Sequence, residues 1–217
     1  MAKIVGIFAH PDDESIGPGG TLAKLGSEND VYLICATGGQ AGENSLKGVK
    51  DLSKVREDEL KTSAKILGVK KVFLLGFEDG ELNNNLYHKL AEKIQKILEE
   101  LKPEKIMTDE IRGISGHIDH ITVAMVTTFV FYKLPFIKEL MYYCIEKREV
   151  MRDYFIYMPP GFDKKDVDLR IDISDVWDKK VAAIKAHKSQ AHDGKYILSL
   201  YKKGIISKIE NFLILKK

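Results

Sequence analysis

The sequence predicts an α/β fold, a Rossmann-like three-layer α/β/α sandwich with a mainly parallel sheet. Two observations support this fold class. Short apolar runs alternate along the chain, up to Pro135, with segments whose apolar residues recur at helical spacing. The runs are continuous and contain β-branched residues, as expected of strands buried on both faces of a parallel sheet. Right-handed crossovers between such strands place helices on both sheet faces.

The elements follow from these patterns in order. We expect strands at Ile4–Ala9, Val31–Ala36, Val72–Leu75 and Lys105–Thr108. Helices are expected at Ile16–Leu25, from an N-cap at Ser53 to Leu67, at Leu86–Leu101, and from a loop at His117 to about Tyr132. The glycines of Gly17–Gly20 lack the spacing of a dinucleotide-binding loop, so they indicate close packing of the helix start on the sheet.

The pattern changes after Pro135. We expect strands at Leu140–Ile145, Tyr154–Tyr157 and Asp168–Ile173, the last with Leu169, Ile171 and Ile173 facing inward. A helix through Val176, Val181 and Ile184 would be capped by Ser174 or Asp175, and Asn211–Leu215 forms either a terminal strand or a helix end.

Length and composition describe an ordinary globular chain. Its 217 residues suit one domain, residues 1–217, with a sizeable core. A net charge of +2 with dispersed lysines predicts no nucleic-acid partner. No apolar run is long enough for membrane insertion and no leader pattern precedes the first strand, so we expect a cytoplasmic protein. Cys35 and Cys144 lie in apolar runs and are expected to be small buried residues.

A histidine and three acids follow the first apolar run: His10, then Asp12, Asp13 and Glu14 after Pro11. Pro11 ends the strand because it lacks a backbone donor. The side chains then lie past the carboxyl end of a strand, where ligands bind in open α/β sheets. The acids alone could simply open the next helix, since its N-terminus is partially positive. That interpretation leaves the histidine unexplained.

A second group of this kind follows the predicted strand Lys105–Thr108. It contains His117, Asp119 and His120. Because parallel strands end at the same edge of a sheet, the two groups can meet in one crevice. Together they suit a metal ion with a base beside it.

The two groups resemble the PIG-L/LmbE family of zinc-dependent N-deacetylases and imply its LmbE-like fold. The resemblance depends on Ala9–Glu14 together with His117–His120. It departs from the family at Gln40, where many members have Glu, and at Glu78, where Pro is more usual. Weaker similarity extends it from Ile4 to about Gln190, through Thr37–Gly42, Arg56–Glu59, Ala64, Ile66–Val69, Gly76–Gly80 and Lys185–Gln190.

The resemblance implies that His10, Asp13 and His120 bind one Zn2+ per subunit. Hydrolytic zinc sites have three protein ligands and an open position for water, which this set would supply. Bound zinc would lower the pKa of its water from ~15.7 toward about 7 and polarise the substrate carbonyl.

The neighbouring residues take the remaining catalytic roles. Asp12 is the expected general base, which receives the proton of the attacking water. His117 is expected to stabilise the developing oxyanion or to protonate the amine. Asp119 would orient a histidine through its other ring nitrogen.

Other polar residues have two interpretations each. By resemblance Arg56 binds substrate, whereas the alternative is a solvated helix arginine. Asp79 could hydrogen-bond sugar hydroxyls, or it could belong to an ordinary Asp-Gly turn. Glu14 is interpreted as a helix-start acid. Three histidines without partners at ligand spacing are interpreted as surface or loop residues: His88, His187 and His192.

The leading hypothesis is a metal-dependent amidohydrolase. It would remove the N-acetyl group of an N-acetylglucosamine-type sugar or glycoconjugate, so its partner is a small N-acetylated sugar. Two alternatives stay open: a non-haem metal oxygenase with the same two-His-one-carboxylate set, and a non-catalytic metal- or sugar-binding protein. Asp12 favours the hydrolase, since neither alternative needs a water-activating carboxylate. Related enzymes are often oligomers, so a homo-oligomer is possible.

Overall fold

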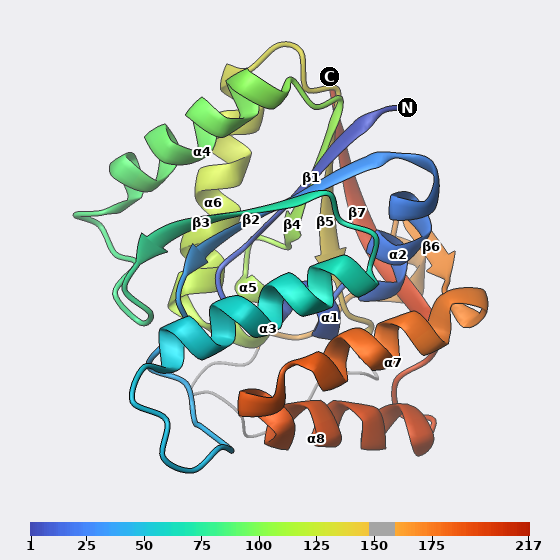
Figure 1. Ribbon diagram of the computed structural model, residues 1–217. Coiled ribbons are helices and arrows are strands. Elements are labelled where there is room, and N and C mark those ends of the chain that lie inside the picture. The colour runs from blue at the N-terminus through green and yellow to red at the C-terminus, as the bar shows by residue number, and fades with distance from the viewer. Residues whose placement is uncertain (148–158) are drawn as a thin grey trace.

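The computed structural model describes residues 1–147 and 159–217. In these residues seven strands form one sheet in the order β3-β2-β1-β4-β5-β7-β6. The strands are β1 (Lys3–Phe8), β2 (Asp30–Thr37), β3 (Lys71–Phe77), β4 (Lys105–Asp109), β5 (Glu139–Cys144), β6 (Leu169–Asp172) and β7 (Ile209–Lys216). The first five are mutually parallel, and β7 pairs antiparallel with both β5 and β6. The predicted α/β class with a mainly parallel sheet is therefore confirmed (Figure 1).

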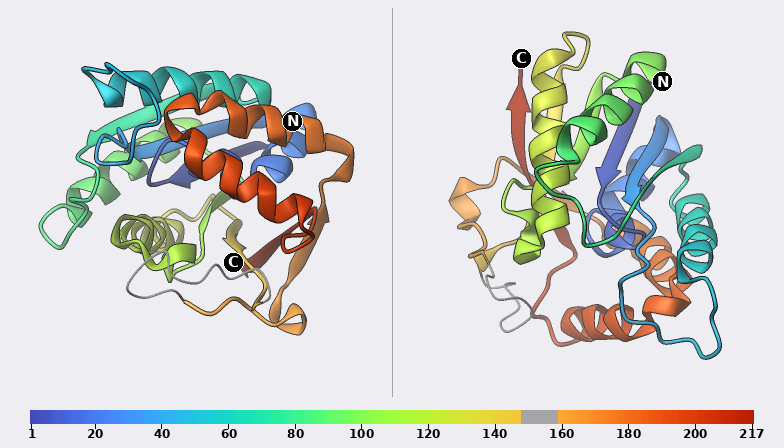
Figure 2. Two further views of the ribbon diagram at one scale, coloured as in Figure 1. Left: turned by 90° about the horizontal axis from the view of Figure 1, so that it is seen from below. Right: turned by 90° about the vertical axis from the view of Figure 1, so that its left-hand side faces the viewer.

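Helices cover both faces of the sheet. They are α1 (Asp13–Ile16), α2 (Gly19–Glu28), α3 (Leu52–Ile66), α4 (Tyr87–Leu101), α5 (Gly113–Gly116), α6 (Ile118–Lys133), α7 (Trp177–Ala186) and α8 (Ala191–Lys202). Short 3-10 helices lie at Lys164–Asp166, Ser174–Val176 and Lys188–Gln190. Two views at right angles to the first show the layered arrangement (Figure 2).

Alternate residues of β1 supply the two halves of the core. Val5 and Ile7 belong to one apolar cluster, which they share with α4 and α6. Ile4 and Phe8 belong to the other, which includes residues of α2, α3 and α7. All four side chains are buried, as the continuous apolar run predicts for a central parallel strand.

The position of β1 creates the crevice in which the site lies. Its neighbours are β2 on one side and β4 on the other, so the chain leaves the end of β1 in one direction and returns on the opposite side. Such a switch of direction opens a gap beyond the strands' carboxyl ends, which is the usual ligand position in open α/β sheets. The residues that follow β1 and β4 border this gap.

The glycines at the start of α2 pack closely, as expected. A Cβ at Gly20 would lie 2.5 Å from the Ile173 side chain, a distance that no real contact tolerates. The helix boundary itself was predicted wrongly. A separate short helix, α1, contains Ile16, and α2 begins only at Gly19, because Pro18 lacks the N–H needed to continue the first helix.

Other boundaries also differ. The N-cap of α3 is Asp51 rather than Ser53, and its carboxylate accepts a hydrogen bond from the Lys54 N–H (3.0 Å). Neither Ser174 nor Asp175 caps α7, because they form a 3-10 turn and Asp175 pairs with Lys24.

Several predictions concern the C-terminal part of the chain. Asn211–Leu215 is a strand, part of β7. Leu169 is 36% exposed rather than inward-facing, because β6 is an edge strand. The strand expected at Tyr154–Tyr157 lies outside the described residues. Helix α8 was not predicted at all, since only Gly194, Ile197 and Leu200 on it are buried.

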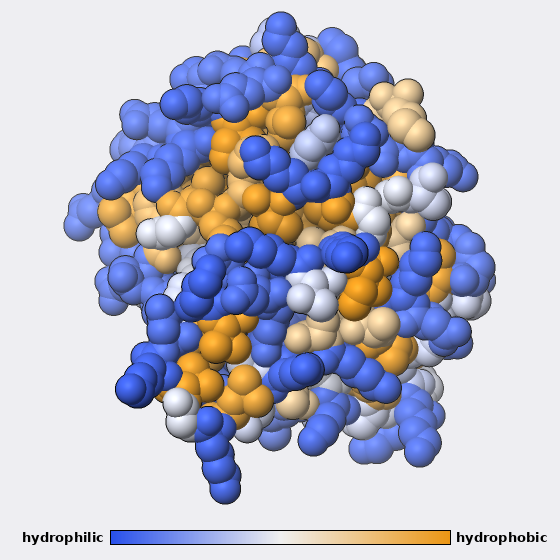
Figure 3. All heavy atoms as spheres, in the orientation of Figure 1, coloured by the Kyte–Doolittle hydropathy of each residue, from blue (hydrophilic) through white to orange (hydrophobic). Residues whose placement is uncertain are grey.

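The surface is mixed in character. Polar side chains cover most of the face shown in Figure 3, and apolar atoms are visible between them. Over residues 1–147 and 159–217, none of the helices combines the length and apolar content needed to cross a bilayer. Cys35 and Cys144 are buried, as expected.

Candidate metal centre and active site

The turn after β1 brings its histidine and acids together. The His10 backbone N–H donates to Oδ2 of Asp13 (2.8 Å), which closes the turn. Between them Asp12 has a φ of 111°, in the left-handed region that non-glycine residues rarely adopt. Strained backbone of this kind concentrates at functional sites, where the surrounding structure holds it in place.

The second group enters the crevice from the start of α6. His117 is the N-cap of this helix, and its Nδ1 accepts a hydrogen bond from the Asp119 N–H (3.1 Å). His120 lies in the first helical turn, so its ring projects toward the end of β1. The two groups that lie more than a hundred residues apart in the sequence therefore share one site, as predicted.

Three side chains form a compact triangle of donor atoms. Nδ1 of His10 lies 3.0 Å from Nε2 of His120, which in turn lies 3.3 Å from Oδ1 of Asp13. The other carboxylate oxygen of Asp13, Oδ2, lies 3.6 Å from His10 Nδ1. Ligands at ~2.0–2.1 Å from a tetrahedral ion lie about 3.3 Å apart. His10, Asp13 and His120 are therefore spaced as three ligands of one small divalent cation.

The other nitrogen of each histidine has an acceptor. Nε2 of His10 lies 2.9 Å from Oδ1 of Asp79 and 3.3 Å from Oδ2 of Asp119. Nδ1 of His120 lies 3.2 Å from the Gly113 carbonyl oxygen. Acceptors behind metal-binding histidines fix the tautomer and ring orientation in this way, so the arrangement fits a metal ion.

The electrostatics of the cluster favour a positive charge. Burial alone would lower the pKa of His10, but hydrogen bonds to Asp119, Asp13 and Asp79 outweigh it and raise that pKa well above 6.5. Burial likewise opposes protonation of His120, whose pKa is nevertheless raised by Asp13 and Asp109. The field that holds protons on these rings would equally attract a cation.

Asp12 lies beside the three candidate ligands, and its carboxyl is influenced by burial and by Arg56. Burial raises the pKa of its carboxyl to about 6, against the opposing effect of the Arg56 guanidinium. The guanidinium lies 3.2 Å from Oδ2 of Asp12 and also donates to the carbonyl oxygens of Gly39 (2.7 Å) and Pro11 (2.5 Å). Arg56 is only 3% exposed, which excludes the solvated alternative.

Glu14 lies at the centre of a buried network rather than simply opening a helix. Its Oε2 accepts from the Asp12 N–H (2.9 Å), and its Oε1 accepts from Ser63 (2.5 Å) and lies 2.8 Å from Nε2 of His187. Glu14 is 1% exposed and His187 is 2% exposed. His187 was predicted to be a surface or loop residue; it does lie in the short connection after α7, but it is buried rather than on the surface. The network ties the strained Asp12 backbone to α3 and to the end of α7.

A second set of ligand atoms overlaps the first. His10, Asp79 and His117 also place one ligand atom each within 4.8 Å of one another. His10 is common to both sets, with Nδ1 facing Asp13 and Nε2 facing Asp79. Asp79 also accepts a hydrogen bond from the Ala41 N–H (3.0 Å), so it is tied to the loop after β2 and is more than an ordinary turn residue.

A polar cleft of about 580 Å3 opens above these residues. Its lining includes His10, Asp12, Asp79 and His117 from the predicted site, with Arg56 beside them. Further polar residues in the lining were not among the predicted site residues: Glu43, Gln190, His192 and Asp193. The cleft therefore offers many hydrogen-bonding groups next to the candidate metal position.

Sequence reasoning missed Asp109. This buried side chain ends β4, and Oδ2 lies 3.5 Å from Nδ1 of His120. Burial raises the pKa of its carboxyl to about 7. The rule that found His10, a polar residue directly after a predicted strand, would also have found Asp109 after Lys105–Thr108.

Fold and site together define an α/β protein with a candidate metal centre at its switch point, an arrangement suited to metal-assisted hydrolysis. Residues 5–131 match the family model described as PIG-L, GlcNAc-PI de-N-acetylase. A probable N-acetyl-alpha-D-glucosaminyl L-malate deacetylase 2 of Bacillus cereus is 30% identical over 190 residues, which cover 85% of this chain and 81% of the relative. The diacetylchitobiose deacetylase of Thermococcus kodakarensis is 30% identical over 198 residues, covering 88% and 70%.

Solved structures agree on the fold. The N,N'-diacetylchitobiose deacetylase of Pyrococcus horikoshii superposes with a TM-score of 0.74 at 23% identity, covering 99% of this chain and 84% of that one. The 4-carboxy-2-hydroxymuconate hydratase GalB of Pseudomonas putida has the same TM-score at 18% identity, covering 100% and 97%. The same architecture therefore serves more than one reaction, and sequence motifs must decide between them.

The chain belongs to the PIG-L family, and it is a hydrolase that acts on amide bonds. The oxygenase and the non-catalytic binding protein are thereby set aside among the sequence hypotheses.

Proposed function

We propose that this protein hydrolyses the N-acetyl group of an N-acetylglucosamine-type sugar or glycoconjugate to a free amine and acetate. The observation that carries the proposal is the triangle of His10, Asp13 and His120 in a chain of this family, with Asp12 beside it. The relatives named above are deacetylases of N-acetylglucosaminyl compounds or of diacetylchitobiose, which supports this substrate class.

His10, Asp13 and His120 would hold one zinc ion. Zinc bound there would supply an activated water and a Lewis acid for the carbonyl oxygen. Two histidine nitrogens and a carboxylate oxygen, spaced as in this cluster, are a donor set of catalytic zinc sites. A tetrahedral ion held by three such ligands would have a fourth position for water.

Asp12 is the proposed general base. With a pKa of about 6, its carboxyl is mostly ionised at neutral pH, yet it is basic enough to receive a proton. Arg56 fixes its orientation through the 3.2 Å contact, and Glu14 holds its backbone.

His117 is the proposed stabiliser of the oxyanion. Because its Nδ1 accepts from the Asp119 N–H, the neutral ring carries its proton on Nε2 and can donate it in a hydrogen bond. Burial and the neighbouring His10 and His120 lower the pKa of His117, which favours this neutral form. Asp119, which is fully buried and accepts from the Gly80 and Leu82 N–H groups, would orient His10.

The polar cleft is the proposed sugar site. Asp79 and Arg56 are in position to meet hydroxyl groups at its metal end, as the resemblance implies. A volume of about 580 Å3 lies within the range of ~300–1,000 Å3 that is common for small-ligand sites.

The test combines metal analysis with an amine-release assay over a panel of N-acetylated sugars. Asp12→Asn is expected to keep its bound zinc and to lose ~10²–10⁴-fold in kcat, the usual contribution of a general base. Asp58→Asn is the matched control, because Asp58 lies on the exposed face of α3. An Asp12→Asn protein with wild-type turnover, or a zinc-loaded wild type that releases no amine from any sugar, would refute the proposal.

A further inference from the structure

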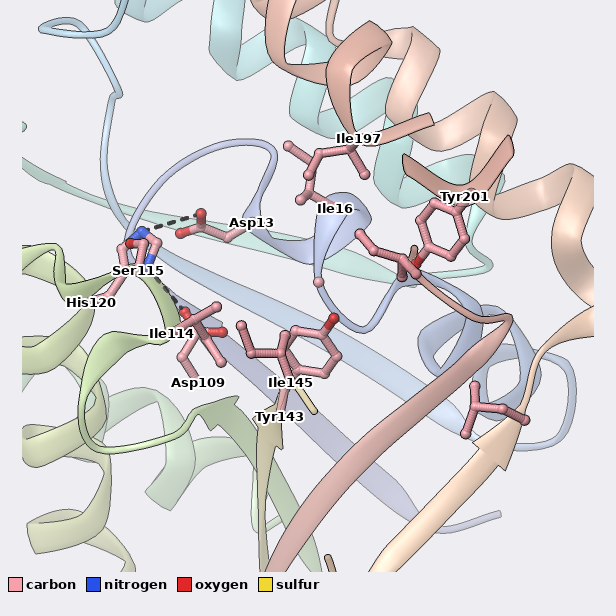
Figure 4. A pocket seen from close by; sticks show the side chains of 13 residues that line it. Asp13, Ile16, Asp109, Ile114, Ser115, His120, Tyr143, Ile145, Ile197 and Tyr201 are labelled. Atoms are coloured by element: carbon pink, nitrogen blue, oxygen red, sulfur yellow. Dashed lines mark ion pairs between the residues drawn. The ribbon is translucent and has the colours of Figure 1, made fainter. Parts of the chain in front are cut away.

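A second cavity begins at the same metal-ligand side chains. It has a volume of about 100 Å3, and Asp13 and His120 form part of its wall, whereas the polar cleft is lined by His10 (Figure 4). Six isoleucines make up most of the remaining wall: Ile16, Ile114, Ile145, Ile197, Ile206 and Ile209. We call this cavity the isoleucine pocket.

Its polar and apolar parts are separated. Asp109 and Ser115 lie at the end near His120, while Ile197 and Tyr201 lie at the far end (Figure 4). A ligand that fits must therefore be polar where it meets the metal ligands and apolar beyond them. Among the described residues that line the pocket, none at its far end is charged.

Helix α8 borders both cavities. Its first turn contributes His192 and Asp193 to the polar cleft, and its later turns contribute Ile197 and Tyr201 to the isoleucine pocket. One helix thus contributes to the walls of both spaces.

The loop opposite α8 is held in a costly conformation. Ile114 has φ 59° and ψ −61°, which a β-branched residue avoids. Its neighbour Gly113 supplies the carbonyl oxygen that contacts Nδ1 of His120. The strained loop therefore joins the wall of the isoleucine pocket to a proposed zinc ligand, as strained segments at ligand sites often do.

The chemistry of an N-acylated sugar matches this division. The hydroxyls need the polar cleft, and the carbonyl must reach the metal position, where Asp13 and His120 also form part of the wall of the isoleucine pocket. The acyl chain begins at that carbonyl carbon, whereas a group on the anomeric oxygen is separated from it by the amide nitrogen and two ring carbons. The acyl chain is therefore the part of the substrate that begins closest to the apolar pocket at Asp13 and His120.

The volume of the isoleucine pocket limits the length of the acyl chain that it can hold. An apolar cavity of ~150 Å3 holds a benzene molecule, so one of about 100 Å3 holds about four carbon atoms. The methyl group of an acetyl would occupy only its entrance. We propose that the isoleucine pocket is an acyl-chain site and that the enzyme removes N-acyl groups of about four to six carbons in preference to acetyl. This inference rests on the proposed deacylase function of the same site.

The test uses the zinc-loaded protein and glucosamine carrying acetyl, butanoyl, hexanoyl or decanoyl groups, with released amine as the readout. Each buried methylene should raise kcat/KM about fourfold, so butanoyl, with two more methylenes, should exceed acetyl by about fifteenfold, and decanoyl should fall again. Ile197→Phe fills the pocket and should reduce the butanoyl-to-acetyl ratio at least tenfold, whereas Ile197→Ala should move the optimum to a longer chain.

Binding gives a readout that is independent of turnover. Butanoate, the acid product, should bind the protein more tightly than acetate in calorimetric titrations, and Ile197→Phe should abolish the preference. Ile205→Phe is the matched control, because Ile205 is 41% exposed and lies outside the pocket lining. Thermal unfolding of each variant shows whether the chain still folds. Misfolding would lower the rate of amine release from all substrates alike, whereas a filled pocket lowers it mainly for the longer acyl groups.

The outcomes separate the two proposals. Release of amine from the acetyl sugar with rates that fall at every added carbon, unchanged by Ile197→Phe, would overturn the acyl-chain site and leave the deacetylase intact. Release from no substrate would overturn the deacetylase itself and the inference with it.

Discussion

Lys180 provides a sharp test of how the fold holds the site. Its side chain is fully buried on α7, and Nζ lies 2.6 Å from Oε1 of Glu210 on β7. Nζ also donates to the carbonyl oxygens of Ile16 (3.2 Å) and Gly17 (2.5 Å), where α1 ends. The ammonium group of Lys180 thus links α7 and β7 to the end of α1, the short helix that begins at Asp13.

Glu210 also accepts hydrogen bonds from the start of α2. Its two oxygens accept from the Gly20 N–H (2.9 Å) and the Thr21 N–H (2.6 Å), so it caps the N-terminus of α2 from another element. Lys180→Met leaves this carboxylate buried without its counter-charge. Breaking a buried pair in this way costs about 3–5 kcal/mol. For a chain of this length each kcal/mol corresponds to ~2–4 °C, so the melting temperature should fall by about 6–20 °C.

The assay is thermal unfolding followed by circular dichroism, with urea unfolding as a check that the m value is unchanged. Lys179→Met is the matched control, since Lys179 is the exposed neighbour and its loss should change stability by no more than about 0.5 kcal/mol. In Lys180→Met/Glu210→Gln no buried charge is left unpaired, so this double variant should be more stable than Lys180→Met alone. Equal melting temperatures for Lys180→Met and Lys179→Met would show that the reasoning is wrong.

Two further predictions concern the site. Removal of zinc by a chelator should lower the melting temperature by about 5–11 °C relative to protein with free zinc at a hundredfold excess over its Kd. His120→Ala should remove this difference. A wild type whose melting temperature does not respond to the chelator would contradict the ligand assignment. The pH dependence of stability should reveal His187, whose pKa burial would lower but Glu14 raises above 6.5. A raised folded-state pKa stabilises the protein fully below about 6.5, and this stabilisation is lost as pH rises through the folded value. The stability difference between wild type and His187→Gln, measured by urea unfolding from pH 5.5 to 8.5, should therefore shrink with rising pH, and a difference that grows would contradict it.

Local patterns were sufficient for much of the site. His10 and Asp13 follow the first apolar run, and His120 lies in a segment after the fourth, so their convergence followed from the geometry of parallel sheets. Residues whose function depends on partners from distant segments were not predictable in this way. Glu14 and His187 form one buried pair across 173 positions, and neither carries a local signal of its partner.

By itself, the sequence determined the class of the fold and the strand ends from which the site is built, and its resemblance to a family implied the candidate ligands. Apolar periodicity and motif spacing are local properties, so they survive without any knowledge of the tertiary structure. Only the tertiary structure decided that Arg56 faces Asp12, that Lys180 and Glu210 meet in the core, and that α8 borders both the polar cleft and the isoleucine pocket. These features depend on packing between segments far apart in the chain, where burial and charge are set by neighbours that no local pattern specifies.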